Sequence, residues 1–555
     1  MKEFPIVHFV RIKPDNIKKM SCKKLLYSLI LLLVFTSACN HAPIVTATDS
    51  LPRSIPEAEG VSSQGILEFL DAAAGSRHEF HSFIFLRHGK VIAEGWWNPY
   101  APELKQSMYS LSKSFTSTAI GFAVSEKRLT VNDKVISFFT EDLPDSVSPF
   151  LADMTVKDLL CMSAGQDQDP TFPIVEKDSN WVKAFLAVPI INDPGTKFLY
   201  NSLGTYMLSA IVQKVTGEKE IDYLTPRLFQ PLGIQGMDWE VDPRGVNTGG
   251  WGLRIKTEDM AKFGQLYLQK GKWNTKQLLP SAWVEEATTA KIWQAPGLPQ
   301  SAKDTNDWLQ GYGYLFWRCR NNAFRGDGAY GQYIIVMPDQ DAVVVITCES
   351  QALQDELNLV WKYLLPAIHK NKLPVNNALS ARLKQKLAAL SLPLPDKGTN
   401  SSLVSTISGK TVTFEPNKWQ LESMLLHFGK DTCFVTMTID QTDYKFTLGA
   451  GRWIGGETTK PGPDLFQSAL SHTTGLLPFR VIGCYSWKDS KTLELVIRYI
   501  ESPHMEKITC RLEQNKILVD LWHSNTPLKK QQTLKGEILS SLSKSNLKTG
   551  KIGKN

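Results

Sequence analysis

Two copies of the pentapeptide SLSKS stand in this chain, at residues 110–114 and 541–545, and each places a serine three positions before a lysine. At that spacing two side chains share one face of a helix, so the lysine can reach the serine hydroxyl. A serine hydroxyl becomes an effective nucleophile when a neighbouring base takes its proton, and a lysine in a partly buried, cationic pocket can have its pKa lowered enough to be that base. The pair could therefore attack a carbonyl carbon.

The surrounding sequence distinguishes the two copies. The second lies in a tail with little apolar material, whereas a nucleophile needs a fixed partner and a wall that excludes water. The first opens the segment 109–126, whose apolar side chains recur at helical spacing and include Leu111, Phe115, Ile120 and Phe122. We expect Ser110 and Lys113 to be the functional pair, with Ser110 at a helix N-terminus whose N–H groups could hold an oxyanion. A helix cap beside a solvated lysine is the alternative.

The elements that must position this helix alternate between strand and helix patterns. Residues 81–97 predict a hairpin, and residues 330–348 predict two strands around a Pro-Asp turn. Helices are expected between them, at residues 155–162, 203–217 and 257–271. Strands, then helices, then strands again favour an α+β fold, a sheet flanked by helices, over residues 55–370.

The pattern changes after residue 370. Residues 371–399 predict a short helix followed by a linker. Residues 400–537 contain β-type segments at roughly ten-residue spacing with turn residues between them, which predicts an all-β domain, either a sandwich or a small barrel. Residues 538–555 are rich in lysine and serine, and we expect them to be disordered.

The N-terminal region is typical of an export signal. Two lysines precede an apolar run over residues 25–35, and small residues stand before Cys39. This order resembles a bacterial lipoprotein signal, in which that cysteine is lipidated. We therefore expect residues 1–39 to be a signal peptide, with Met20 as an alternative start, and residues 40–54 to be a tether. The expected location is the periplasm or cell envelope, with a lipid anchor at Cys39; a cleaved signal that releases a soluble protein is the alternative.

The distribution of charge argues against a nucleic-acid partner. The formal net charge is +7, but residues 1–24 carry seven basic and two acidic side chains, and residues 528–555 carry seven basic and one acidic. The region between them is therefore slightly acidic. Because the positive charge lies in a leader and a tail, no basic face for nucleic acid is expected.

Cysteine and histidine spacing gives no metal site. The six cysteines after residue 39 are far apart, which predicts buried thiols; a disulfide among Cys433, Cys484 and Cys510 stays open. His78 and His81 have no third ligand nearby and predict a surface pair. We expect neither a metal nor an organic cofactor.

The first SLSKS copy is one of six segments that together resemble a known superfamily. In chain order the segments are GKVIAEGWW, YSLSKSFTSTAIGFAV followed by LTVNDKV, TVKDLLCMSAG, FLYNSLGTYMLSAIVQKVTG, GGWGLRIKTEDMAKFGQLYLQKGKW and GDGAYGQYIIVMP. Their order is similar to that of the serine β-lactamases and penicillin-binding proteins, particularly the class C-like branch of esterases, D-aminopeptidases and amide-oligomer hydrolases. The resemblance covers about residues 55–370. It implies a β-lactamase/transpeptidase-like fold, with an antiparallel sheet, flanking helices and a helical subdomain.

The resemblance also implies roles for individual residues. Ser110 would be the acylated nucleophile and Lys113 its base partner. The family's Tyr-x-Asn element reads here as Tyr200, Asn201 and Ser202, so the Tyr200 phenol would carry a proton to and from the leaving group. Ser202 replaces the usual asparagine and would reach less far toward Lys113, which Asn201 could offset. A packed core tyrosine is the alternative for Tyr200.

The third family element, Lys-Thr-Gly or His-x-Gly in relatives, is best matched by Gly326, Asp327 and Gly328. A strand without side chains would let a substrate's backbone lie close. The N–H of Ala329 would then be the second oxyanion donor, beside that of Ser110.

This variant of the third element bears on the substrate. Relatives that bind a carboxylate commonly carry a cationic or hydroxyl residue on this strand, and here an aspartate would repel a carboxylate. That favours an ester or a neutral amide over a penicillin. Whether Asp327 faces away, and whether Arg325 or Arg320 restores a positive charge, stays open because strand direction is not fixed by the sequence.

The sequence therefore predicts an exported serine hydrolase that cleaves an ester or amide through an acyl-enzyme, acting on a small molecule or a cell-wall-derived substrate. A peptidoglycan-directed D-peptidase or weak β-lactamase is one alternative. A non-catalytic envelope protein that binds a ligand is another. The substrate, the oligomeric state and the role of the β domain stay open.

Overall fold

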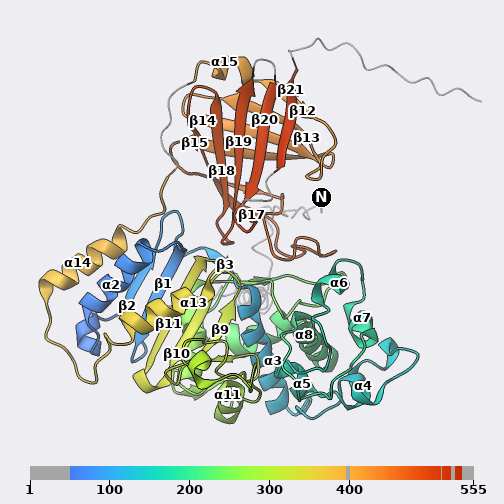
Figure 1. Ribbon diagram of the computed structural model, residues 1–555. Helices are drawn as coiled ribbons and strands as arrows, with labels where there is room; N and C mark the ends of the chain where they lie inside the picture. The colour runs from blue at the N-terminus through green and yellow to red at the C-terminus, as the bar shows by residue number, and fades with distance from the viewer. Residues whose placement is uncertain (1–49, 395–400, 514–515, 527–531, 540–555) are drawn as a thin grey trace, which may run out of the picture. The chain divides into compact units, whose positions relative to one another are not determined.

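The computed structural model describes residues 50–394, 401–513, 516–526 and 532–539 (Figure 1). The proposed signal peptide, Cys39, and the second SLSKS copy lie outside these ranges. Within them, no helix combines the length and the apolar character that a membrane span requires.

A six-stranded antiparallel sheet forms the centre of the first domain. The strands are β1 (Glu79–Arg87), β2 (Lys90–Trp96), β8 (Trp317–Arg318), β9 (Phe324–Gly328), β10 (Gln332–Met337) and β11 (Ala342–Glu349). Their order is β2-β1-β11-β10-β9-β8. The hairpins β1–β2 and β10–β11 confirm the two strand pairs predicted from the sequence, and β1 pairs directly with β11.

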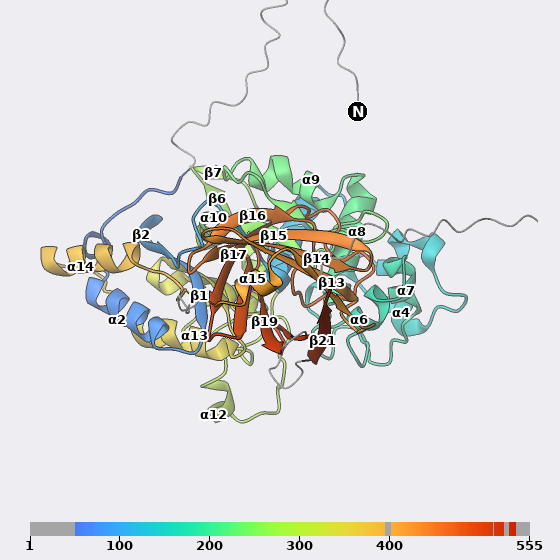
Figure 2. The ribbon, with the colours of Figure 1, turned by 90° about the horizontal axis from the view of Figure 1, so that it is seen from above.

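Helices cover both faces of this sheet. Alternate side chains of β1 enter different cores: Ile84 belongs to the cluster shared with α3 and α10, and Phe85 to the cluster shared with α2 and α13. The flanking helices are α2 (Ser63–Ala74), α3 (Ser112–Ser125), α10 (Thr257–Leu268), α13 (Leu353–Leu359) with its π-helical continuation η8 (Val360–Leu364), and α14 (Asn377–Ala388). The predicted helix before the linker, α14, packs against α2 and β2, and it lies beside α2 in both ribbon views (Figures 1 and 2).

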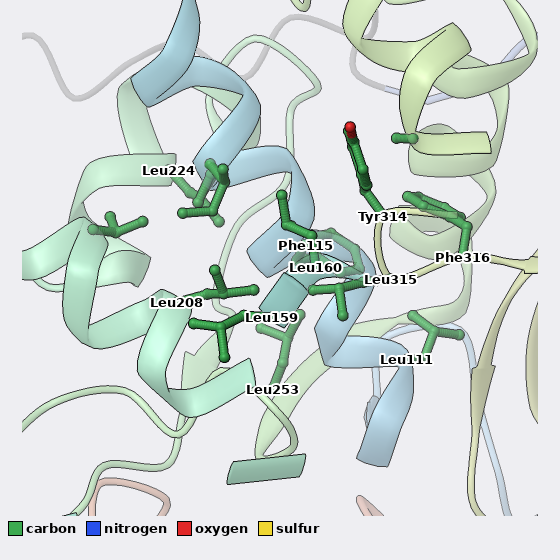
Figure 3. Packing of buried hydrophobic residues seen from close by; sticks show 14 of the residues in the cluster. Leu111, Phe115, Leu159, Leu160, Leu208, Leu224, Leu253, Tyr314, Leu315 and Phe316 are labelled. Atoms are coloured by element: carbon green, nitrogen blue, oxygen red, sulfur yellow. The ribbon is translucent and has the colours of Figure 1, made fainter. Parts of the chain in front are cut away.

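Over its described residues the first domain contains eight further α-helices, some of which pack around α3. They are α4 (Pro149–Asp153), α5 (Val156–Leu160), α6 (Thr171–Val175), α7 (Trp181–Ala187), α8 (Ser202–Thr216), α9 (Glu220–Leu224), α11 (Ser281–Thr288) and α12 (Gln300–Lys303). Leu111 and Phe115 pack among leucines from α5, α8 and α9 and from β5 (Leu253–Lys256), as Figure 3 shows. Residues 112–123 of α3 are buried on every side. A helix held this way has little freedom to move.

The second domain is a closed antiparallel barrel. Its strands are β12 (Lys410–Phe414), β13 (Leu421–Phe428), β14 (Thr432–Ile439), β15 (Thr442–Ala450), β16 (Ile454–Thr458), β17 (Phe479–Trp487), β18 (Thr492–Tyr499), β19 (Met505–Glu513), β20 (Lys516–His523) and β21 (Gln532–Ile538). The order is β15-β14-β13-β12-β21-β20-β19-β18-β17-β16, and a short parallel pairing of β15 with β17 closes the ring. The all-β prediction is confirmed, as a barrel rather than a sandwich. Cys433, Cys484 and Cys510 are buried, free thiols.

The prediction of a surface histidine pair is wrong. His81 is fully buried, stacks on Tyr100 at 3.9 Å and lies 3.0 Å from Glu79. His78 is also buried, with Nδ1 2.8 Å from the Ser350 hydroxyl. Both belong to β1 or its approach, and β1 is buried because β2 and β11 flank it and helices cover both faces of the sheet. Among the described residues, no group of three His, Cys, Asp or Glu side chains could hold a metal ion.

Candidate active site

Ser110 lies in the turn that leads into α3. The 3-10 turn η3 (Tyr109–Leu111) directly precedes the helix, and Tyr109 has a left-handed φ of 46°. Ser110 is partly exposed, while Lys113, in the first turn of α3, is buried. The lysine Nζ lies 3.0 Å from the Ser110 Oγ. The i, i+3 spacing therefore brings the two groups together as expected.

Three oxygens surround the Lys113 amine. Besides Ser110, Nζ lies 3.0 Å from Ser202 Oγ and 2.7 Å from the carbonyl oxygen of Gly250. Burial lowers the pKa of Lys113 from 10.5 to about 7, and the nearby carboxylates of Asp169 and Asp327 partly oppose this shift. The pKa of Lys113 falls because the amine is removed from water and not because of a cationic pocket, since the charged groups that act on it are acidic.

Ser202 and Asn201 have different tasks at the start of α8. Ser202 is the first residue of the helix, and its short side chain does reach Lys113. Asn201 caps the helix by accepting from the N–H of Gly204 at 2.9 Å, and its amide donates to Gln166 Oε1 at 3.2 Å. Asn201 is thus engaged elsewhere and does not compensate for the serine.

Tyr200 stands beside the same amine. Its ring centroid lies 4.9 Å from Lys113 Nζ, and its ring stacks on Trp317 at 5.6 Å. Burial raises the pKa of Tyr200 above its usual value, and a hydrogen bond with Ser110 partly opposes that rise. The phenol therefore stays protonated at neutral pH, next to both Ser110 and Lys113.

The glycines of β9 lie against the segment that carries Ser110, where a Cβ atom would not fit. A Cβ atom on Gly328 would lie 2.2 Å from the carbonyl oxygen of Met108, and one on Gly326 would lie 3.0 Å from Ser114 Oγ. The sequence suggested that these glycines make room for a substrate; the structure shows that they let β9 approach the turn that carries Ser110. Ala329 follows β9 directly, in the turn to β10, and is partly exposed.

Asp327 and the neighbouring arginines are paired within the protein. Asp327 is buried, and its carboxylate accepts from Arg325 Nε at 2.8 Å. Arg325 is fully buried and lies over the Trp308 ring at 4.4 Å. Arg320 pairs with Asp307 at 2.8 Å. Asp327 does not face solvent, and both arginine charges are balanced by these carboxylates.

The family assignment rests on a match to a family model described as Beta-lactamase, which spans residues 81–365, just over half of the chain. This protein belongs to the beta-lactamase family. It is a serine hydrolase of the β-lactamase-related type.

Several relatives of this beta-lactamase family member have been characterised or solved. It is 26% identical over 289 residues to a 6-aminohexanoate-dimer hydrolase of Paenarthrobacter ureafaciens, covering 48% of this chain and 71% of the relative. An octameric penicillin-binding protein homologue of Pyrococcus abyssi is similar over 85% of this chain and 99% of its own, at 16% identity and a TM-score of 0.44. A penicillin-binding protein homologue of Caulobacter crescentus is similar over 54% of this chain and 95% of its own, at 17% identity and a TM-score of 0.44.

Sequence reasoning missed three groups that line the site of this beta-lactamase family protein. The Gly250 carbonyl lies within GGWG, a segment that was matched to relatives without being given a role. The carboxylate of Asp169, in a loop, raises the pKa of Lys113, and Trp317 of β8 stacks on Tyr200. No spacing in the sequence relates either residue to Ser110.

Proposed function

We propose that the protein hydrolyses an ester or amide of a small acyl compound through an acyl-enzyme on Ser110. The observation that carries the proposal is the environment of Lys113. With a pKa of about 7, roughly half of the Lys113 amines are neutral at pH 7, whereas almost none would be at the usual value of 10.5. A neutral amine has two N–H groups and one lone pair, so it can donate to Ser202 and Gly250 and turn the lone pair toward the Ser110 hydroxyl.

The proposed reaction balances its protons through two groups. Ser110 Oγ attacks the carbonyl carbon as Lys113 takes the hydroxyl proton. Tyr200, held protonated by its raised pKa, gives its proton to the leaving oxygen or nitrogen, and the proton on Lys113 restores the phenol. Water then attacks the acyl-enzyme and gives up a proton to the same pair. The pair returns that proton to Ser110 Oγ as the bond from Oγ to the acyl carbon breaks, which releases the acid.

The proposed oxyanion donors are the backbone N–H groups of Ser110 and Ala329. Ser110 precedes a helix whose positive end favours negative charge. Ala329 follows β9, which is held against the Ser110 turn by the close approach of Gly328 to Met108. Two N–H groups fixed in this way stabilise charge as it develops on the carbonyl oxygen.

An uncharged acyl group is the substrate that these residues favour. A carboxylate beside β9 would find no free arginine, because Arg325 is paired with Asp327 and Arg320 with Asp307. The similarity to a hydrolase named for the 6-aminohexanoate dimer is consistent with an amide. Substrate profiling with esters, neutral amides, D-amino amides and β-lactams tests this choice. Preferred turnover of a β-lactam or a peptide ending in D-alanine would instead support the D-peptidase or β-lactamase alternative.

Export and lipid anchoring at Cys39 are also proposed, on the order of basic, apolar and small residues before that cysteine. Expression in a bacterial host with a labelled fatty acid would test the anchor. Label that is present in the native chain and lost in Cys39→Ala supports lipidation. Label in neither chain would favour a cleaved soluble signal or no export.

The test of the catalytic proposal is the intact mass of the mature chain after treatment with a fluorophosphonate. One adduct is expected, lost in Ser110→Ala and retained in Ser541→Ala, which alters the second SLSKS copy as a matched control. No adduct on the native chain would overturn the proposal and favour a non-catalytic ligand-binding protein.

A further inference from the structure

A turn of the barrel domain contacts the segment that leads to Ser110. Residues 500–504 connect β18 to β19, and the carbonyl oxygen of Glu501 accepts from the N–H of Ser107 at 2.9 Å. The Gln106 amide donates to the carbonyl oxygen of Ile500 at 2.9 Å. Gln106 and Ser107 belong to β3 (Lys105–Ser107), which ends two residues before Tyr109. The barrel is therefore joined by two hydrogen bonds to the strand that leads into the nucleophile turn.

His504, at the end of this barrel turn, contacts Tyr109. The histidine is fully buried, with Nε2 2.7 Å from the Tyr109 hydroxyl and Nδ1 2.6 Å from Glu349 Oε1. His504 is therefore hydrogen-bonded through one ring nitrogen to Tyr109 and through the other to Glu349. The Asp464 carboxylate, also from the barrel domain, lies 3.2 Å from the same hydroxyl.

The same histidine contacts the turn that carries the other proposed oxyanion donor. The Tyr330 ring meets His504 edge to face at 4.5 Å and Tyr109 at 5.4 Å. Tyr330 directly follows Ala329, as Tyr109 directly precedes Ser110. His504 thus packs against both tyrosines that flank the proposed oxyanion donors, and the two tyrosine rings also contact each other.

Both flanking tyrosines have an unfavourable backbone conformation. Tyr109 has φ of 46° and Tyr330 has φ of 65°. Residues with a Cβ adopt this left-handed region only where the surroundings hold them there. The torsions of Tyr109 orient the peptide that contains the Ser110 N–H, so a relaxed Tyr109 would turn that donor away from the reacting carbonyl.

We propose that His504 is a positioning residue, supplied by the barrel domain, which holds Tyr109 and Tyr330 so that the N–H groups of Ser110 and Ala329 converge on one point. This rests on the proposed function of Ser110. The barrel domain then completes the active site.

The test compares two tyrosines that bond to the same barrel turn. Tyr109→Phe removes the hydroxyl that meets His504, and Tyr100→Phe removes a buried hydroxyl that donates to the carbonyl oxygen of Ser502 at 3.3 Å. The rate constant for fluorophosphonate acylation, kcat and KM are measured for both, together with His504→Phe and His504→Gln. Hydrogen exchange over residues 105–117 reports on the turn without requiring activity.

The expected pattern is specific to His504 and Tyr109. Tyr109→Phe and His504→Phe should lower the acylation rate roughly 10- to 100-fold through kcat, because small displacements at a reacting centre have effects of that size. They should also speed exchange at residues 105–117. Tyr100→Phe should stay within about twofold of the native chain, as expected for a lost contact away from the reacting atoms. His504→Gln, whose side-chain amide can still form a hydrogen bond with the Tyr109 hydroxyl, should recover part of the loss.

Three outcomes would overturn the positioning role. The first is acylation and exchange in Tyr109→Phe that match Tyr100→Phe. The second is a His504→Phe variant that loses acylation only because it unfolds, while Tyr109→Phe is acylated at the native rate. The third is an unreactive native chain whose exchange at residues 105–117 is unchanged by either variant. An unreactive native chain whose exchange does rise in both variants would defeat the proposed function but support the role of His504 in holding the turn.

Discussion

The hydroxyl of Ser202 lies 3.0 Å from Nζ of Lys113, the same distance that separates this amine from Ser110. Serine therefore keeps this contact although its polar atom lies one bond closer to the backbone than those of the family's usual asparagine. It does so because Ser202 begins α8 next to the buried lysine.

Ser202→Ala should lower kcat/KM roughly tenfold, because the Lys113 amine loses one acceptor and a hydrogen bond to such a group contributes about 1.5 kcal/mol. Steady-state kinetics on the best ester would measure it. Ser202→Thr keeps the hydroxyl and is the control. An alanine variant with native kinetics would show that Ser202 does not orient the lysine.

The acylation rate should follow the titration of Lys113. The pKa of this lysine is lowered to about 7, and the neutral amine is the base. The rate should therefore rise about tenfold per pH unit below pH 7 and level off above it. Fluorophosphonate acylation between pH 5 and 9 would show the profile, and Lys113→Arg, always charged, should not react at any pH. A rate that falls with rising pH would contradict a basic role.

The ion pair of Asp327 with Arg325 should matter more to stability than exposed pairs do. Asp327→Asn leaves a fully buried guanidinium without its carboxylate, which should lower the free energy of unfolding by about 3 kcal/mol. Asp167→Asn removes an exposed pair with Lys197 and should cost less than about 1 kcal/mol. Urea titrations would compare the two. Equal effects would mean that Arg325 finds another partner.

Gly328→Ala should separate β9 from the nucleophile turn. The added methyl would meet the carbonyl oxygen of Met108 at 2.2 Å, so we expect a loss of about 1–3 kcal/mol in stability and at least tenfold slower acylation. Gly297→Ala, where a Cβ meets no atom within 4 Å, is the control. A Gly328 variant that behaves like this control would show that β9 can shift without consequence.

Removing residues 396–555 should leave the first domain folded but change its turnover. The deletion keeps α14 and most of both cores of the six-stranded sheet, since only Phe466 and Ala469 of one core and Ile482 and Ile500 of the other are lost. It also removes His504 and uncovers Trp251, which stacks on Phe466 at 4.1 Å. Circular dichroism and ester kinetics on the shortened chain would test this. An insoluble chain or one with native kinetics would count against the prediction.

Local patterns predicted the parts of the site that local geometry builds. Ser110 and Lys113 meet because i, i+3 spacing on a helix brings them together, and Tyr200 and Ser202 were found because they share one short motif. The Gly250 contact could not be predicted, since a backbone carbonyl leaves no mark in residue type.

The features that the sequence did not predict depend on contacts between segments far apart in the chain. His504 reaches Tyr109 from 395 residues away, in another domain, and no periodicity in either segment relates them. His78 and His81 were expected on the surface because no third metal ligand stands near them. Their spacing along the chain does not show whether the strand that carries them is interior or at an edge of the sheet. Helices on both faces of the sheet decide that.

The pairing of β1 with β11 also affects how the chain can fold. Ser82 and Thr347, joined by a hydrogen bond of 2.5 Å across these strands, are 265 residues apart. During synthesis β1 can pair with β2 early, but its other neighbour, β11, is available only after it has left the ribosome. Contacts between segments so far apart in the sequence slow folding. The helix α3 can form early, but the core around it is complete only when β10 and β11 have joined the sheet.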